Sequence, residues 1–279
     1  MADIIDAHHH LWQYDAQEYS WISPEMEVLQ TDFLPADLES AMESAGISGS
    51  VAVQARQSIQ ETRWLLDQAE KSTGILGVVG WLPLQSPALP GLLAQFSENP
   101  RLKGLRHVVQ DEPDPDFILG SAFNKGIEAL LGTGLTYDIL IHARHLPQTI
   151  EFAGRHPQQA FVLDHCGKLA IGEGSFETWR DNMRLLAQHQ NVSCKLSGLA
   201  TQTASGHWTL DALRPYLDAA LEAFGPTRLM AGSDWPVCLL ATTYARWWSA
   251  LRQWGSALDE SSHAAIFGGT ARRVYHLGD

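Results

Sequence analysis

The stretch Ile4-Ile5-Asp6-Ala7-His8-His9-His10-Leu11-Trp12 is a short apolar run that ends in three consecutive histidines. Side chains alternate between the two faces of a β-strand, so His8 and His10 share one face and His9 lies on the other. Two imidazoles side by side at a strand end suit a cation, a water molecule or a carbonyl oxygen. The stretch therefore predicts a first β-strand whose end carries a functional site.

Similar apolar segments recur along the whole chain. Eight of them, several dense in Val, Ile and Leu, are predicted to be strands buried on both faces: residues 3–10, 49–56, 75–82, 102–109, 136–143, 160–165, 192–197 and 228–234. Helical patterns fill the intervals and follow the last strand: residues 34–45, 61–72, 88–98, 123–131, 148–155, 176–188, 210–223, 242–254 and 260–275.

This alternation of strands and helices predicts βαβ units and a parallel sheet. Eight repeats over 279 residues favour an α/β fold in which residues 1–279 form a single (β/α)8 TIM-type barrel domain. A doubly wound open sheet is the alternative. Its dinucleotide-binding version is disfavoured because no Gly-rich phosphate loop follows the first strand.

Composition restricts the partners. The chain has 32 acidic and 19 basic residues, and a net charge of −13 would repel nucleic acid and anionic membranes. No secretory signal and no run of about 18 apolar residues is visible, so we expect a cytoplasmic protein without a membrane partner. Cys166, Cys194 and Cys238 fit no zinc or disulfide pattern and are expected to be buried thiols.

Polar and aromatic residues gather where the predicted strands end. In a TIM barrel the carboxyl ends of the strands carry the active site. The residues found there are His8, His10, Trp12, Gln54, Arg56, Trp81, Arg106, His107, His142, Arg144, His145, Asp164, His165, Lys195, Ser197, Asp234 and Trp235. A purely structural barrel has no reason to concentrate such groups at one end, so we expect a catalytic cavity there.

Several motifs resemble the amidohydrolase superfamily: Asp6-x-His8-x-His10, a histidine that closes the sixth strand, and Gly232-Ser233-Asp234-Trp235-Pro236. Six further stretches, in order and across essentially the whole chain, are similar to its sugar-lactone hydrolase branch: Val79-Gly80-Trp81, Leu102-Lys103-Gly104-Leu105-Arg106-His107, Tyr137-Asp138-Ile139-Leu140, Leu163-Asp164-His165-Cys166-Gly167-Lys168, Cys194-Lys195-Leu196-Ser197-Gly198 and Ile266-Phe267-Gly268-Gly269-Thr270-Ala271.

The resemblance implies an enzyme that opens a small sugar lactone, an aldonolactone such as L-fuconolactone, to the sugar acid. Two alternatives stay within the superfamily: a lactonase for an aromatic-derived dicarboxylate lactone, and a metal-dependent decarboxylase. A non-catalytic sugar-binding barrel is a third alternative. It predicts ligand binding without turnover.

The chemistry of the residues agrees with ester hydrolysis. Asp234 is expected to act as general base, taking a proton from the attacking water and returning it to the ring oxygen. The alternative for Asp234 is a helix N-cap before Pro236. His165 is expected to polarise the lactone carbonyl or to orient the water, and His8 and His10 complete the expected catalytic group.

The remaining strand-end residues are expected to bind the substrate. Arg106, His107, Arg144 and Lys195 could hold ring hydroxyls or the oxyanion. Gln54 and His142 are expected in the same cavity. Aromatic rings could stack on the apolar face of a sugar, with plain packing as the alternative: Trp12, Trp81 and Trp235.

A metal site is a further expectation. One divalent ion such as zinc could be held by His8, His10, His142, His165 and Asp234. The lysine that bridges two metals in binuclear members of the superfamily has no counterpart beside Arg106 and His107. Lactones are reactive esters, and the resemblance to the lactonase branch implies that hydrolysis can proceed without a metal. We therefore expect that no cofactor is required and that an ion, if bound, is not essential.

Overall fold

A computed structural model describes residues 3–172, 174–203 and 207–278. In this part of the chain eight strands form one sheet, each parallel to the next, in the order of the sequence. The strands are β1 (Ile5–His9), β2 (Gly49–Val53), β3 (Ile75–Gly80), β4 (Leu102–Val108), β5 (Thr136–Leu140), β6 (Phe161–Leu163), β7 (Val192–Leu196) and β8 (Leu229–Ala231).

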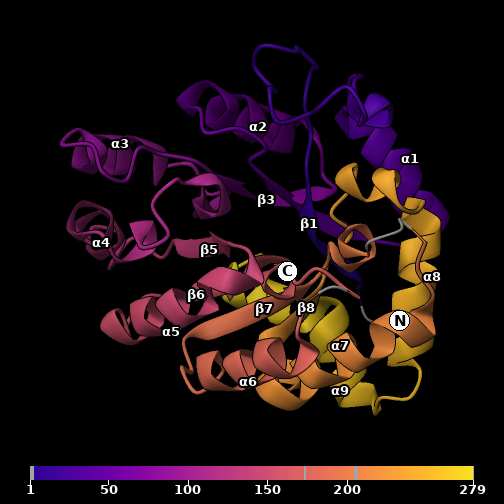
Figure 1. Ribbon diagram of the computed structural model, residues 1–279. Helices are drawn as coiled ribbons and strands as arrows, with labels where there is room; N and C mark the ends of the chain where they lie inside the picture. Colours follow the sequence, from indigo (N-terminus) through magenta and orange to yellow (C-terminus); the bar gives the residue numbers. More distant parts are fainter. Residues whose placement is uncertain (1–2, 173, 204–206, 279) are drawn as a thin grey trace.

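Helices surround the strands, as Figure 1 shows. They are α1 (Pro35–Ala45), α2 (Ile59–Lys71), α3 (Leu89–Phe96), α4 (Ser121–Glu128), α5 (Leu146–Arg155), α6 (Phe176–Leu186), α7 (Leu210–Phe224), α8 (Tyr244–Gly255), α9 (Glu260–Ala264) and α10 (Thr270–Val274). Every predicted helix is present. The one predicted over 260–275 is divided by the π-helical turn Ala265–Gly269.

The sheet closes on itself between the residues that follow β8 and the end of β1. The backbone N–H of Asp234 donates to the carbonyl of His8 at 2.8 Å, and that of His10 donates to the carbonyl of Trp235 at 2.6 Å. The predicted (β/α)8 barrel is therefore confirmed, and the open-sheet alternative is wrong. Each strand ends earlier than predicted, because its last residues leave the sheet and form the turns that carry polar side chains.

The barrel interior is filled in layers. One layer is apolar and includes side chains from five strands and the C-terminal Tyr275: Ile5, Val51, Val79, Val162 and Met230. The next layer is polar and fully or almost fully buried: His8, Arg106, Asp138 and Lys195. The side chains of both layers point inward, because alternate residues of a barrel strand face the axis.

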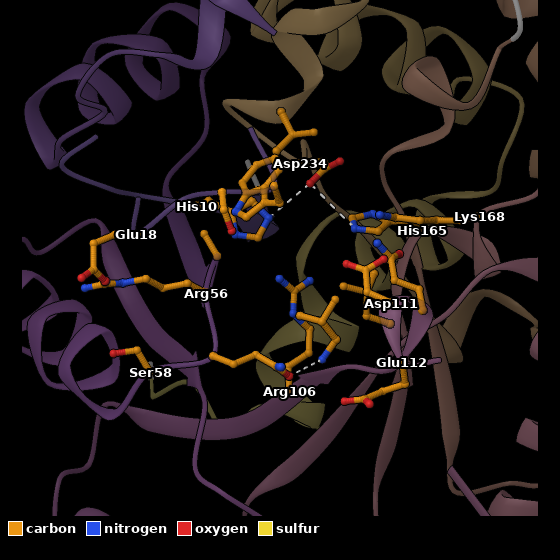
Figure 2. A pocket seen from close by; sticks show the side chains of 18 residues that line it. His10, Glu18, Arg56, Ser58, Arg106, Asp111, Glu112, His165, Lys168 and Asp234 are labelled. Atoms are coloured by element: carbon orange, nitrogen blue, oxygen red, sulfur yellow. Dashed lines mark hydrogen bonds and ion pairs between the residues drawn. The ribbon is translucent and has the colours of Figure 1, made fainter. Parts of the chain in front are cut away.

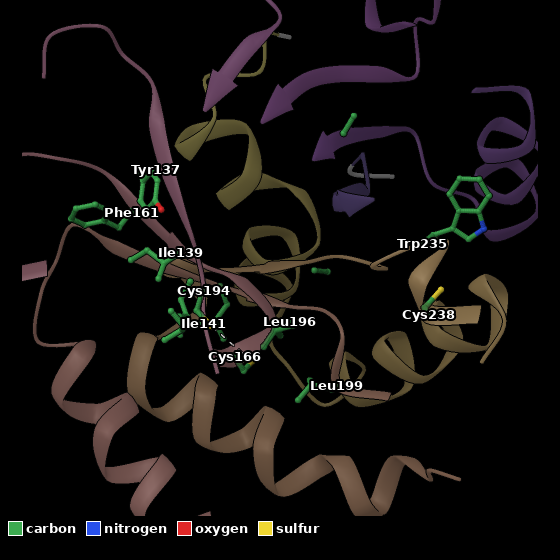
Figure 3. Packing of buried hydrophobic residues seen from close by; sticks show 14 of the residues in the cluster. Tyr137, Ile139, Ile141, Phe161, Cys166, Cys194, Leu196, Leu199, Trp235 and Cys238 are labelled. Carbon is green, nitrogen blue, oxygen red and sulfur yellow. Dashed lines mark hydrogen bonds between the residues drawn. The ribbon is translucent and has the colours of Figure 1, made fainter. Parts of the chain in front are cut away.

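The opposite faces of the same strands pack against the helices. In β7, Cys194 and Leu196 lie in this outer core (Figure 3). Lys195, between them in the sequence, faces inward. All three cysteines are buried and free, as predicted. In the described part of the chain, no helix has both the length and the apolar character that crossing a bilayer requires.

Candidate active site

The end of β1 is bent by an irregularity that aims two histidines inward. The register between β1 and β2 shifts between Asp6 and His9. The Asp6 carboxylate accepts the backbone N–H of His8 at 3.1 Å and that of Ser233 at 2.8 Å. Such a bulge re-aims the side chains that follow it. The Nε2 atoms of His8 and His10 lie 3.2 Å apart, so the prediction that they share a face is confirmed.

Asp234 reaches the same point from the turn after β8. Its φ of 59° is left-handed, a conformation that Asp tolerates better than most residues. Its Oδ1 is surrounded by three imidazole Nε2 atoms: His10 at 3.4 Å, His8 at 3.7 Å and His165 at 3.8 Å. Figure 2 shows Asp234 between His10 and His165. Segments far apart in the sequence therefore converge, as the barrel prediction required.

His165 sits on a strained turn that follows β6. Four consecutive residues have positive φ: His165 (54°), Cys166 (51°), Gly167 (73°) and Lys168 (47°). A left-handed non-glycine residue costs roughly 1–2 kcal/mol, and such strain is typical of functional sites. The Nδ1 of His165 lies 2.9 Å from the Ser197 hydroxyl. A Cβ on Gly198 would lie 2.7 Å from the same ring, so glycine is needed there.

Paired charges lie directly beneath these imidazoles. The Lys195 ammonium has three polar neighbours: Asp138 at 2.6 Å, Asp164 at 3.0 Å and His8 Nδ1 at 3.1 Å. Arg106 donates to Asp164 at 2.9 Å and to the carbonyl of Gln54. Burial raises the pKa of Asp164, but Lys195, His8 and Arg106 outweigh it and hold that pKa well below its usual range. This buried layer of paired charges holds the His8 ring in place from below.

The protonation states of the site follow from burial and from these neighbours. Burial raises the pKa of Asp234, but the imidazoles of His165, His10 and His8 more than offset this and lower it. Burial lowers the pKa of His165 to about 4, and it lowers that of His10 as well. At neutral pH the site thus holds one ionised carboxylate, the state that can accept a proton, among neutral imidazoles.

A cavity of about 460 Å³ opens above this group. Its floor includes Asp234, His10, His165 and Arg106 (Figure 2). Its walls come from the β1–α1 loop, the turns after β2, β4 and β6 and the segment after β8: Glu18, Ser20, Trp21, Arg56, Ser58, Asp111, Glu112, Lys168 and Val237. Arg56 is ion-paired with Glu18 across one side. The cavity is large enough for one small ring molecule.

Two predicted residues lie beneath the cavity rather than in its wall. His8 is fully buried and contacts His10, Arg106 and Lys195. Lys195 is fully buried and is paired with carboxylates. We therefore correct the expectation that Lys195 binds ring hydroxyls: its ammonium holds His8 and two aspartates in place.

Two other predicted residues lie on the wrong side of the sheet. His107 follows the inward Arg106 in β4, so it faces the helices, where its ring stacks on Phe117 at 4.9 Å. Its Nε2 lies 2.6 Å from Glu112. The indole N–H of Trp81 donates to His107 at 3.3 Å, so Trp81 belongs to this outer cluster as well. Neither side chain lines the cavity.

Three further predicted residues, two tryptophans and a glutamine, also lie outside the cavity wall. Trp12 is buried in the core, where its indole N–H donates to the Thr31 carbonyl. Trp235 is likewise buried and packs edge-to-face on Phe33. Gln54 is buried, and its amide donates to the Arg106 carbonyl at 3.3 Å.

Arg144 and His142 lie in the turn that follows β5. Arg144 bonds to His145 at 3.1 Å and is exposed. His142 is half-buried, with its ring 6.3 Å from that of His145. Neither lines the cavity.

Sequence reasoning missed several wall residues. Glu18 and Trp21 belong to a long loop whose conformation no periodicity encodes. Asp111 and Glu112 follow the end of β4 by three and four residues, and no motif or periodicity in the sequence marks them as cavity residues. Lys168 follows His165 by three residues in the stretch Leu163–Lys168, and this proximity could have indicated that it reaches the same cavity.

The residues present fit one divalent ion. Two described groups have ligand atoms within 4.8 Å of one another: His8, His10 and Asp234, and His8, Asp164 and His165. The Nδ1 of His10 donates to the Val53 carbonyl at 2.7 Å, which places the lone pair on Nε2, the atom that faces His8 and Asp234. Imidazole and carboxylate donors suit zinc. His142, which we expected as a ligand, is in neither group.

Comparisons with known proteins agree with this geometry. The chain is 41% identical to an L-fucono-1,5-lactonase of Burkholderia multivorans, over 98% of this chain and 96% of that protein. It is 37% identical to an L-fucono-1,5-lactonase of Burkholderia ambifaria, over 98% and 95%. Both relatives are matched over nearly their whole lengths.

A solved structure resembles the entire barrel. It is an amidohydrolase from Burkholderia multivorans with bound zinc, 41% identical to this chain, with a TM-score of 0.96 over 99% of this chain and 100% of that one. The family model described as amidohydrolase matches residues 5–277. With this match across the barrel, and with relatives above 30% identity along almost all its length, the chain belongs to the amidohydrolase family.

Proposed function

We propose that this chain, as a single barrel domain, hydrolyses a sugar lactone to the sugar acid, with L-fucono-1,5-lactone as the first candidate substrate. The observation that carries the proposal is the Asp234 carboxylate at the cavity floor, with His10 and His165 at 3.4 and 3.8 Å. The two relatives named L-fucono-1,5-lactonase support the choice of substrate.

The reaction needs a base, a bound water and a group that stabilises negative charge. Asp234 takes a proton as the water oxygen attacks the lactone carbonyl carbon. The carbonyl electron pair moves to oxygen, and its return breaks the bond between that carbon and the ring oxygen. Asp234 then returns the proton to the leaving oxygen. The products are the hydroxy acid, ionised at neutral pH, and one proton in solution.

A bound ion would lower the pKa of a water at this site. His8, His10 and Asp234 are the residues that would hold it. We propose that catalysis does not depend on it, because a lactone is a reactive ester and the cavity already offers a carboxylate base with cationic side chains nearby.

The charges of the cavity favour a neutral substrate over a dicarboxylate. A dicarboxylate requires two cationic clamps, ideally arginines that bind in a bidentate manner. Arg56 is already paired with Glu18, and Arg106 with Asp164. Asp111 also lines the wall, has no ion-pair partner among the described residues, and would repel a second carboxylate. The same repulsion disfavours an aromatic acid as a decarboxylase substrate.

The proposal is tested by proton release in weakly buffered indicator solution. A panel of neutral aldonolactones and lactone dicarboxylates is compared for the wild type and Asp234→Asn. We expect turnover of a neutral lactone and a loss of about 10²- to 10⁴-fold in Asp234→Asn. Asp67→Asn, on the exposed part of α2, is the control for the loss of one carboxylate. A preference for charged lactones, or an unimpaired Asp234→Asn, would refute the proposal.

A further inference from the structure

Three residues that line the cavity have cationic side chains: Arg56, Arg106 and Lys168. Arg56 is paired with Glu18, and both terminal nitrogens of Arg106 already donate, one to Asp164 and one to Gln54. Its backbone N–H donates to the His165 carbonyl, but among the described residues the Lys168 side chain has no hydrogen-bond or ion-pair partner. Its three N–H donors are therefore available to a bound molecule.

The turn after β6 fixes where Lys168 stands. Left-handed conformations at His165, Cys166, Gly167 and Lys168 return the chain so that His165 and Lys168 line one cavity (Figure 2). Burial lowers the pKa of Lys168, while the carboxylates of Asp234, Asp164 and Asp111 act in the opposite direction. Among the described residues, no hydrogen bond or ion pair joins the ammonium to any of these carboxylates, so none of them occupies it.

Other groups near Asp234 are less able to stabilise an oxyanion. His165 is neutral, its Nδ1 is engaged with Ser197, and its Nε2 faces Asp234. Arg106 is held in the buried ionic layer by the two contacts described above. A charged donor without a protein partner is the better source of an interaction that strengthens as negative charge develops.

We propose that the Lys168 ammonium binds the carbonyl oxygen of the lactone and stabilises the oxyanion formed when water attacks. This inference rests on the proposed lactonase function. Lys168 donates hydrogen bonds throughout and transfers no proton: the carbonyl electron pair moves to the oxygen beside Lys168 and returns as the ring bond breaks. One oxygen of the product carboxylate is then left beside the same ammonium.

The test removes the ammonium and then restores it chemically. Lys168→Met is compared with Lys168→Cys before and after alkylation with 2-bromoethylamine, which places an ammonium at nearly the length of lysine. The native thiols are buried, so the introduced cysteine is the reactive one. Lys125→Met, on the exposed side of α4, is the matched control.

We expect Lys168→Met to lose about 10²- to 10³-fold in kcat on L-fucono-1,5-lactone, the range found on removal of one oxyanion donor. Inhibition by the product L-fuconate should weaken about tenfold or more, in the range of a charge-assisted hydrogen bond. Alkylated Lys168→Cys should recover most of the lost rate. Circular dichroism and the melting temperature should match the wild type, and Lys168→Gln replaces Lys168→Met if the latter does not fold.

Two results would overturn the inference: a Lys168→Met rate within threefold of the wild type, or a lost rate that alkylation does not restore in a folded Lys168→Cys protein. Failure of the underlying function looks different. In that case the wild type itself would hydrolyse none of the lactones, and the inference would fall with it.

Discussion

The Nε2 of His10 lies 3.4 Å from Oδ1 of Asp234, while its Nδ1 lies 2.7 Å from the Val53 carbonyl oxygen. A carbonyl oxygen only accepts, so Nδ1 carries the proton of the neutral ring and Nε2 turns a lone pair toward the carboxylate. Two acceptors that face each other need a donor or a cation between them. This pair therefore marks the place where a water molecule and a metal ion would compete.

The first prediction concerns that competition. Dialysis against a chelator, with zinc content checked by elemental analysis, should leave kcat on a neutral lactone within threefold of the untreated enzyme, because Asp234 can deprotonate water that no ion holds. Added zinc should bind the wild type with a stoichiometry of about one and bind His10→Ala at least tenfold more weakly. Activity that disappears with the zinc and returns with it would contradict the prediction.

The second prediction concerns the buried ionic layer. Lys195→Met leaves Asp138 and Asp164 without their shared cation, and breaking a buried pair in this way costs about 3–5 kcal/mol of unfolding free energy. Denaturant unfolding measures the loss. Asp138→Asn in the Lys195→Met background should recover at least about 1 kcal/mol, because it removes one uncompensated charge.

An exposed ion pair is the matched control for this experiment. Lys71 pairs with Asp67 on the surface of α2, and Lys71→Met should cost less than about 1 kcal/mol. Equal losses for Lys195→Met and Lys71→Met would mean that the buried layer contributes nothing beyond an ordinary surface pair.

Much of this architecture could be predicted because it follows from simple periodicities. The alternation of strands and helices predicted the barrel. The active site of such a barrel lies at the carboxyl ends of its strands, and this rule predicted that His8, His10, His165 and Asp234 lie close together. The same alternation, applied to β4, would have placed His107 on the helix side, since Arg106 faces inward. That error came from treating neighbouring residues at a strand end as equivalent.

Other features depend on tertiary contacts that no period encodes. The bulge at Asp6 is held by the backbone of Ser233, which is 227 residues away in the chain. The left-handed turn at His165 is accommodated by the missing side chain of Gly198 on the next strand's loop. Glu18 and Trp21 reach the cavity from a long loop, so their positions also required the folded structure.

The third prediction concerns pH. Glu61, in the first turn of α2, is buried and accepts the backbone N–H groups of Ala55 and Arg56. Burial raises its pKa from 4.5 to about 7, and the two backbone hydrogen bonds only partly offset this. The folded state then holds a proton that the unfolded state has released. Stability from this group is full below pH 4.5 and is lost as the pH rises to about 7.

Residue 61 cannot titrate in Glu61→Gln, so a comparison of this variant with the wild type isolates the contribution of Glu61 to the pH dependence of stability. The unfolding free energy of the wild type minus that of Glu61→Gln should fall by about 3 kcal/mol between pH 4.5 and 7. Other titrating groups cancel in the difference, and a lost acceptor adds only an offset that does not vary with pH. Exposed Glu43→Gln controls for the loss of one carboxylate. A difference that stays constant over this range would contradict the prediction.

The last prediction separates the tryptophan that lines the cavity from one that only packs. Trp21 lines the wall and is 36% exposed, whereas Trp12, whose ring meets it edge-on at 5.7 Å, has no exposed surface. A sugar ring can stack on Trp21, so Trp21→Ala should raise KM for a neutral lactone about tenfold, or about 1.4 kcal/mol, with unchanged stability. Trp21→Phe keeps an aromatic face and should remain close to the wild type. Trp12→Ala should instead cost about 3–5 kcal/mol of unfolding free energy, because it empties a packed core position. Steady-state kinetics and denaturant unfolding on the three variants decide the matter: a KM unchanged in Trp21→Ala would remove Trp21 from the binding site.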